Sequence, residues 1–337
     1  MGRADLTADE AGLALGEILE GRATPAQVAA FAVALRVKGE SVAEISGLVA
    51  AMLDHAEPVP VADGDGDGDA LIDTCGTGGD RSGSINVSTL AALVAAGAGA
   101  RVCKHGNRAA SSVSGSADVL EALGVAIDVG PEGVRRCLEQ AGMGFCFAPR
   151  FHPALRHAGP VRRELGAPTV FNFLGPLANP ARVRRQVIGV SDPAMAEKMI
   201  GVLAARDALR ALVVYGHDGL DELSTTGPST VLDLAGGEVR TYDVEPSALG
   251  LGPATVEDLR GGDATRNAAI VRGVLSGEPG PHRDIALLNG AAGLLVAGLA
   301  ADLTEGLTLG ERSIDDGRAA GVLERLVAAS NTAAACP

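Results

Sequence analysis

From residue 70 onward the sequence alternates short apolar runs with longer stretches of helical periodicity. The runs that we expect to form strands are Leu71–Asp73, Arg101–Lys104, Val125–Ile127, Gly144–Phe147, Gln186–Val190 and Ala211–Tyr215, followed by two shorter ones near Thr230–Leu234 and Val239–Val244. A helical C-terminus should begin at about Ala264. Such alternation predicts an α/β fold with a central, mainly parallel sheet that binds its ligands at the carboxyl ends of the strands.

The first part of the chain predicts a small all-helical domain. Three pairs of residues have the spacing of a capping box, which marks the start of a helix: Thr7 with Glu10, Thr24 with Gln27, and Ser41 with Glu44. We therefore expect three domain-level segments: a small helical domain at 1–60, an Asp/Gly linker at 61–69, and a large α/β domain at 70–337.

The Asp/Gly repeat at 63–69 superficially resembles a calcium-binding loop. Counting from Asp63, the twelfth position is Thr74, where such a loop requires a bidentate Glu. We therefore interpret the repeat as a surface linker without a calcium site.

A glycine-rich turn follows the first predicted strand, in the stretch Asp73–Asp80. Gly76, Gly78 and Gly79 allow the backbone to adopt positive φ and to approach a ligand closely. Successive N–H groups in such a turn can line a concavity that suits phosphate. The turn therefore predicts a phosphate-binding loop.

Two well-known phosphate loops are excluded. No Lys follows the glycines, as a P-loop requires, and Arg81 stands where a dinucleotide fingerprint needs Gly. Ser88 and Thr89 add hydroxyl groups where the next helix should begin, and a helix N-terminus favours an anion. The expected phosphate ligand is therefore neither a nucleoside triphosphate nor NAD.

Polar residues also follow the second predicted strand, in the stretch Lys104–Ser112 and at Ser116. Lys104 offers a point charge to phosphate, and Arg108 could do the same or pair with a carboxylate. Asp221 and Glu222, at another strand end, suit magnesium, although adjacent carboxylates also occur in solvated acidic turns.

A further candidate is the Arg162-Arg163 pair. Either guanidinium could clamp a carboxylate of the ligand, while the other pairs with Glu164 or faces solvent. The sequence alone does not choose between them.

The charge balance and the cysteines restrict the class of protein. The formal net charge is −14 and only three lysines occur, which disfavours nucleic-acid binding. The five cysteines are odd in number and match no zinc pattern. We found no signal peptide and no apolar run near the roughly 20 residues that span a bilayer, so we expect a cytoplasmic protein with reduced thiols.

Taken together, these stretches resemble the anthranilate phosphoribosyltransferase family. The similarity covers almost the whole chain, and Lys104-His-Gly-Asn107 is its most specific motif. The resemblance implies the fold of the pyrimidine nucleoside phosphorylases, with residues near 165–185 joining the helical domain and with a homodimer formed through the helices. Ala167-Pro168 departs from the family, since many relatives have Arg before the Thr-Val-Phe-Asn run.

The resemblance also implies the site residues. Those for phosphoribosyl pyrophosphate are Gly76, Gly79, Asp80, Ser84, Asn86, Val87, Ser88, Thr89, Lys104, His105, Gly106, Asn107, Arg108, Ala109, Ala110, Ser111, Ser112 and Ser116. Those for anthranilate are Gly76, Asn107 and Arg162. Those for Mg²⁺, with two ions expected, are Ser88, Asp221 and Glu222, which are also the expected catalytic residues.

The implied activity is phosphoribosyl transfer from phosphoribosyl pyrophosphate to anthranilate, a step of tryptophan biosynthesis. Two alternatives remain at this point. A pyrimidine nucleoside phosphorylase is disfavoured by Arg162 with Asn107, which suit a carboxylated amine better than a nucleobase. A non-catalytic nucleic-acid-binding relative is disfavoured by the net charge of −14, the intact Asp221-Glu222 pair and the 2% aromatic content.

Overall fold

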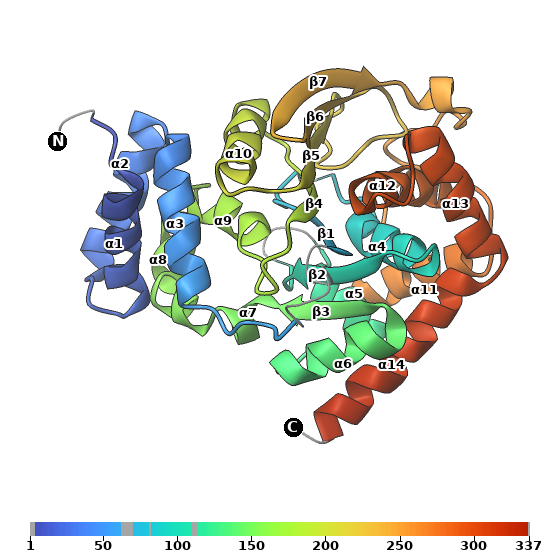
Figure 1. Ribbon diagram of the computed structural model, residues 1–337, viewed down its shortest axis with the longest axis horizontal. Helices are drawn as coiled ribbons and strands as arrows, with labels where there is room; N and C mark the ends of the chain where they lie inside the picture. The colour runs from blue at the N-terminus through green and yellow to red at the C-terminus, as the bar shows by residue number, and fades with distance from the viewer. Residues whose placement is uncertain (1–3, 62–69, 81, 110–112, 336–337) are drawn as a thin grey trace.

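The computed structural model describes residues 4–61, 70–80, 82–109 and 113–335. A small group of helices lies at one end of the molecule, and a larger part with a central sheet occupies the rest (Figure 1). The predicted Asp/Gly repeat falls within 62–69 and lies outside the described residues. No helix among the described residues is long and apolar enough to cross a membrane.

The small group of helices begins where the sequence predicts. The three capping boxes are present at the N-termini of α1 (Ala8–Leu19), α2 (Pro25–Lys38) and α3 (Val42–Asp54). Two short helices from the middle of the chain pack against them, α8 (Gly159–Leu165) on α2 and α9 (Phe171–Leu177) on α3. One hydrophobic cluster joins these helices to a face of the sheet.

The sheet has seven strands in the order β3-β2-β1-β4-β5-β6-β7. The first five strands along the chain pair in parallel, and β6 and β7 extend β5 as antiparallel neighbours. The mainly parallel sheet predicted from the sequence is thus confirmed. The strands are β1 (Leu71–Gly76), β2 (Arg101–Gly106), β3 (Met143–Phe147), β4 (Arg185–Gly189), β5 (Arg210–Gly216), β6 (Ser229–Ala235) and β7 (Glu238–Val244).

The strand predicted at Val125–Ile127 is wrong. This stretch runs between two helices, and its apolar side chains enter the core below the sheet. Both edges of β2, the preceding strand, are occupied by β1 and β3, and Val125 and Ile127 pack into the hydrophobic core instead of pairing with a strand. The backbone N–H of Ala126 donates instead to Ser330 Oγ at 3.1 Å.

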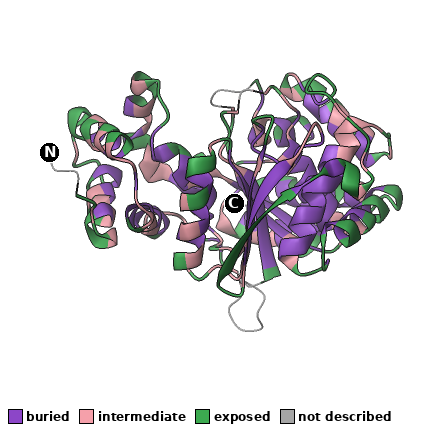
Figure 2. Ribbon diagram, turned by 90° about the horizontal axis from the view of Figure 1, so that it is seen from above, coloured by how far each residue is buried: buried purple, intermediate pink, exposed green. Residues whose placement is uncertain are grey.

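Helices cover both faces of the sheet, and its strands are mostly buried except β7, which is exposed along most of its length (Figure 2). One face carries α4, α12 and the helices that pack on them, and the other carries α10 with α3 and α9. The remaining helices are α4 (Val87–Gly97), α5 (Ser116–Ala122), α6 (Pro131–Ala141), α7 (Ala148–Phe151), α10 (Pro193–Ala205), α11 (Ala264–Leu275), α12 (Pro281–Ala297), α13 (Leu303–Asp315) and α14 (Arg318–Ala335), with 3₁₀ turns at Pro153–His157 and Pro246–Leu249.

The strand order reverses between β1 and β4. The chain leaves β1 for β2 and β3 on one side and returns to β4 on the other. Loops that diverge at such a point leave a crevice outside the carboxyl ends of the strands, where α/β proteins bind ligands. Gly76 and Gly189 are paired at this edge, and the N–H of Thr77 donates to the Gly189 carbonyl at 2.9 Å. The fold therefore places a ligand crevice at the glycine-rich turn.

Candidate active site

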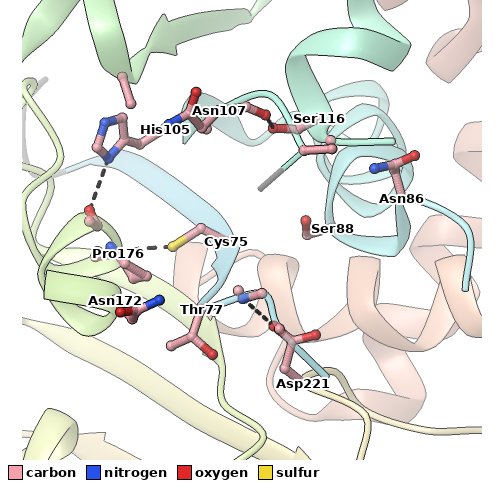
Figure 3. A pocket seen from close by; sticks show the side chains of 18 of the residues that line it. Cys75, Thr77, Asn86, Ser88, His105, Asn107, Ser116, Asn172, Pro176 and Asp221 are labelled. Carbon is pink, nitrogen blue, oxygen red and sulfur yellow. Dashed lines mark hydrogen bonds between the residues drawn. The ribbon is translucent and has the colours of Figure 1, made fainter. Parts of the chain in front are cut away.

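A cavity of about 360 Å³ opens at this edge of the sheet (Figure 3). Most of its lining comes from four parts of the chain: the β1–α4 connection, the β2–α5 connection, α8 with α9, and the segment after β5. Of the residues expected at the site, those that line it are Gly76, Gly79, Asp80, Ser84, Asn86, Val87, Ser88, Lys104, His105, Gly106, Asn107, Arg108, Ala109, Ser116, Arg162, Asp221 and Glu222.

Four expected site residues do not appear in that lining. Thr89 is fully buried in α4, one residue further along the helix than Ser88. Ala110, Ser111 and Ser112 lie outside the described residues.

The glycine loop (Gly76–Asp80) has the backbone that its sequence predicts. Gly78 and Gly79 have φ of 66° and 89°, values that favour glycine. Gly76 serves a different purpose, because a Cβ there would lie 2.5 Å from Asp221 Oδ2. The N–H of Gly78 donates to the same oxygen at 2.7 Å. The glycine loop therefore packs directly on the carboxylates that follow β5.

Asn86 connects the two ligand loops. Its Nδ2 donates to the Ser114 carbonyl at 3.0 Å, and its Oδ1 accepts from Asn267 Nδ2 at 2.9 Å. Asn267 also accepts the N–H of Gly262 at 2.8 Å. The side chain of Asn86 thus fixes the start of α4 relative to the β2–α5 connection, in addition to lining the cavity.

Lys104 is buried beneath the cavity, with only 1% of its surface exposed. Its ammonium donates to the Thr74 carbonyl and, at 3.1 Å, to Ser88 Oγ. Burial raises the pKa of Glu222, and the positive charge of Lys104 opposes that rise. Lys104 therefore supplies a fixed positive charge at the floor of the site.

Arg108 pairs with carboxylates, which is the second of the two roles that the sequence left open. Its guanidinium donates to Asp118 at 3.0 Å and to Glu121 at 2.8 Å, on α5. It still lines the cavity, but both of its partners are carboxylates of the protein.

Asp221 and Glu222, the acidic pair, are 8% and 9% exposed. Burial, the charge of Glu222 and the charge of Asp80 raise the pKa of Asp221 well above its usual range. Burial and Asp80 likewise raise the pKa of Glu222. The surrounding protein therefore does not fully compensate the charged form of either carboxyl group, and a cation at this wall of the cavity would do so.

Such a pair fits a divalent cation. The described residues form no cluster of three or more His, Cys, Asp or Glu side chains suited to a metal, so they provide no closed site. Magnesium commonly uses one or two carboxylates and completes its shell with water and substrate phosphate oxygens. The N–H of Ser88 holds Glu222 Oε1 at 3.2 Å, which leaves the pair beside the N-terminus of α4.

The C-terminal end of α9 is anchored to the sheet by buried side chains. His105 Nδ1 bonds the Gly175 carbonyl at 3.0 Å, and Gln186 Nε2 donates to the Pro176 carbonyl at 3.0 Å. Asn179 Nδ2 donates to Asp73 Oδ2 at 2.8 Å and to the Cys103 carbonyl at 2.7 Å. Because a carbonyl only accepts, His105 must donate from Nδ1.

Burial sets the charge of His105, against the effect of its hydrogen bond to Gly175. Burial, together with nearby His152, lowers its pKa to about 3, so the ring is neutral. Figure 3 shows His105 reaching toward α9, with Asn107 after β2 and Ser116 at the start of α5 nearby. Phe171 and Asn172 of α9, which sequence reasoning did not single out, line the cavity as a result. In the sequence they appear only within the Thr-Val-Phe-Asn run of the family resemblance.

The structure distinguishes Arg162 from Arg163. Arg162 is half-buried, lines the cavity and lies over the Phe171 ring at 5.8 Å from its centroid. No carboxylate among the described residues forms an ion pair with it. Arg163 is exposed and does not line the cavity. Arg162 is therefore the cation available to a ligand carboxylate.

Comparisons with known proteins agree on one family. The model of the glycosyl transferase family, α/β domain, matches residues 68–320, and that of its helical bundle domain matches residues 1–56. The anthranilate phosphoribosyltransferase of Roseiflexus castenholzii is 56% identical, over 97% of this chain and 95% of its own.

Solved structures agree as well. The anthranilate phosphoribosyltransferase of Thermus thermophilus superposes with a TM-score of 0.91 at 43% identity, covering 98% of this chain and 97% of its own. The Saccharomyces cerevisiae enzyme, solved in complex with PRPP and Mg, has a TM-score of 0.89 at 30% identity. Its complex with 4-fluoroanthranilate has a TM-score of 0.87 at 29% identity, and both yeast structures cover 97% of this chain and 94% of their own.

Proposed function

The chain belongs to the glycosyl transferase family with a helical bundle domain and an α/β domain, and we propose that it is the enzyme that transfers phosphoribosyl from phosphoribosyl pyrophosphate to anthranilate. The products are N-(5-phosphoribosyl)anthranilate and pyrophosphate, in tryptophan biosynthesis. One observation carries the proposal: a single cavity joins a glycine loop, an acidic pair and an arginine without a carboxylate partner among the described residues. These parts suit a pyrophosphate, a divalent cation and a carboxylated amine respectively.

The donor should bind along the loops at the ends of β1 and β2. Backbone N–H groups of the glycine loop and the N-terminus of α4 offer donors to its phosphates. Ser88, Asp221 and Glu222 would hold Mg²⁺, for which the yeast relative's complex with PRPP and Mg is the precedent, and we propose two ions. The metal would neutralise charge that develops on the departing pyrophosphate.

The chain's own residues contribute orientation and electrostatic stabilisation. The Lys104 ammonium places positive charge next to Ser88. Groups that are already fixed where negative charge develops lower the activation barrier of the transfer, because the protein need not reorganise during the reaction. An arylamine is already nucleophilic, so the site requires no strong base. Holding that nitrogen in line with C1 of the ribose can supply several kcal/mol of the barrier. Closure of the loops around the cavity would exclude water from the donor.

The acceptor should lie between Arg162 and Asn107, with its carboxylate on the guanidinium. Arg162→Ala is expected to raise KM for anthranilate roughly ten- to hundred-fold, because a charge-assisted hydrogen bond contributes about 1.5–3 kcal/mol. KM for the donor should change little. Steady-state kinetics with each substrate varied in turn measures both constants.

Arg163→Ala is the matched control, since this neighbouring arginine is exposed. It should leave both constants near those of the unmodified protein. If the two variants exchange behaviour, Arg163 is the clamp. If neither affects anthranilate, the acceptor site is elsewhere.

A turnover assay tests the proposed activity itself. Purified protein should consume anthranilate only when phosphoribosyl pyrophosphate and Mg²⁺ are both present, and should release one pyrophosphate for each anthranilate. Chelation should stop the reaction. Cleavage of thymidine or uridine by phosphate, with anthranilate untouched, would favour a nucleoside phosphorylase. Tight binding of single-stranded DNA with no turnover would contradict an enzyme.

We further propose how the chain is organised in solution. Residues 1–60 with about 165–185 would form one domain, 61–69 a linker, and 70–337 the donor-binding domain. A homodimer through the helical domain is supported by exposed apolar side chains on α1 and α2, at Leu13 and Val37. A cytoplasmic location is supported by the four described cysteines, which are free thiols.

A further inference from the structure

Asn289 lies in the middle of α12, with 2% of its surface exposed, and it does not line the cavity. Its Oδ1 accepts the N–H of Leu223 at 3.0 Å, and its Nδ2 donates to the Leu223 carbonyl at 2.8 Å. A third bond joins Nδ2 to the Ile285 carbonyl at 2.9 Å. Two of the three hydrogen bonds therefore hold the backbone of the single residue that follows Glu222.

The segment around Leu223 needs such a partner. It is buried and irregular, so no strand satisfies its peptide groups, and a buried unpaired N–H or carbonyl is costly. The side-chain amide of Asn289 presents one acceptor and one donor, as the backbone of a neighbouring strand would. The orientation of the amide is fixed, because the Leu223 N–H only donates and its carbonyl only accepts.

The opposite side of the acidic pair is confined by glycines. A Cβ at Gly189 would lie 1.5 Å from the Asp221 carbonyl oxygen, and one at Gly76 would lie 2.5 Å from Asp221 Oδ2. The backbone of the pair is therefore held between the ends of β1 and β4 on one side and Asn289 on the other. Small displacements of α12 at Asn289 would move both carboxylates together.

We propose that Asn289 is a positioning residue for metal-assisted transfer, which sets the Asp221 and Glu222 carboxylates where they bind Mg²⁺ with the donor. This inference rests on the proposed function. Residues that orient metal ligands affect metal affinity or activity roughly 10- to 100-fold when they are replaced. Asn289 acts through the backbone of Leu223 and touches no substrate in this arrangement.

Asn289→Leu tests the proposal, because leucine has a similar volume and no hydrogen-bonding group. The Mg²⁺ concentration at half-maximal rate should rise roughly ten-fold or more, while KM for anthranilate stays within about two-fold. Excess Mg²⁺ should restore much of kcat. A calorimetric titration of Mg²⁺ with phosphoribosyl pyrophosphate present and anthranilate omitted should show the same weakening without any turnover.

Ser330→Ala is the matched control. Ser330 lies on the C-terminal helix α14 and likewise accepts a backbone N–H, the part-buried one of Ala126, but away from the cavity. The Ser330→Ala variant should have a lower melting temperature but the same Mg²⁺ concentration at half-maximal rate. If Asn289→Leu behaves in the same way, with unaltered Mg²⁺ binding, Asn289 is only structural and the inference is overturned.

A milder variant keeps the test decisive if Asn289→Leu does not fold. Asn289→Ser replaces the two polar atoms that bond Leu223 by a single oxygen on a shorter side chain, and should still weaken Mg²⁺ binding in the calorimetric titration. Unchanged binding in Asn289→Ser would also overturn the inference. If the unmodified protein binds Mg²⁺ with the donor but consumes no anthranilate, the proposed function fails while the comparison of Mg²⁺ binding still decides the role of Asn289.

Discussion

Replacing Asp221 by Asn and Glu222 by Gln together is expected to lower kcat by roughly two orders of magnitude or more. The amides cannot hold Mg²⁺ in place of the carboxylates, so stabilisation of the departing pyrophosphate is lost. Stopped assays over a range of Mg²⁺ concentrations measure the effect. Equal turnover of the variant and the unmodified protein at limiting Mg²⁺ would remove the metal assignment.

The same variant should keep its fold. Burial and mutual repulsion already disfavour the charged forms of the pair, as the raised pKa of each carboxyl indicates. The amide oxygen that replaces the Asp221 carboxylate can still accept the Gly78 N–H, which now bonds Asp221 at 2.7 Å. We therefore expect a melting temperature, measured without metal, that is no lower than that of the unmodified protein. A large decrease would mean that the activity loss reflects unfolding.

Much of the architecture could be predicted because its signals are local. The capping boxes at Thr7, Thr24 and Ser41 lie within four residues of the helices that they start, and all three are present. The glycine loop follows an apolar strand directly and Lys104 lies near the end of the next one, and parallel strands bring their carboxyl ends to one edge of the sheet. Sequence reasoning therefore located most of the cavity lining without knowing the strand order.

The unpredicted features depend on distant pairings. Asn179 reaches Asp73 across 106 positions of sequence, and Asn289 reaches Leu223 across 66. Nothing local identifies either asparagine, because each looks like an ordinary polar residue until the neighbouring backbone is placed. The wrong strand at Val125–Ile127 has the same origin, since its apolar run is genuine but it packs into the core and its backbone bonds the distant Ser330.

The three lysines of the chain illustrate how this acidic protein uses scarce positive charge. Lys38 bonds the fully buried Glu44 at 2.8 Å, and Lys198 bonds Glu40, which is 3% exposed, at 3.3 Å. Lys104 opposes the rise in pKa that burial causes at Asp73 and Glu222. Each lysine thus compensates a buried carboxylate, but only Lys104 does so beneath the cavity.

Lys104→Met should therefore affect stability and catalysis together. Removing the cation from a site with buried carboxylates is expected to cost about 3 kcal/mol of unfolding free energy, measured by urea denaturation. It also removes fixed positive charge next to Ser88, so kcat/KM for phosphoribosyl pyrophosphate should fall roughly hundred-fold or more. A variant with full activity would contradict a role for Lys104 in the site.

Lys198→Met separates the two effects. It also takes a cation from a buried carboxylate, that of Glu40, but neither residue lines the cavity. Its unfolding free energy should therefore decrease, while kcat/KM measured at a temperature where the protein remains folded should stay within about two-fold of the unmodified value. If both variants lose activity only in proportion to the unfolded fraction, Lys104 acts through stability alone. If Lys104→Met is far less active at equal folded fraction, its charge contributes directly to binding or expelling the pyrophosphate.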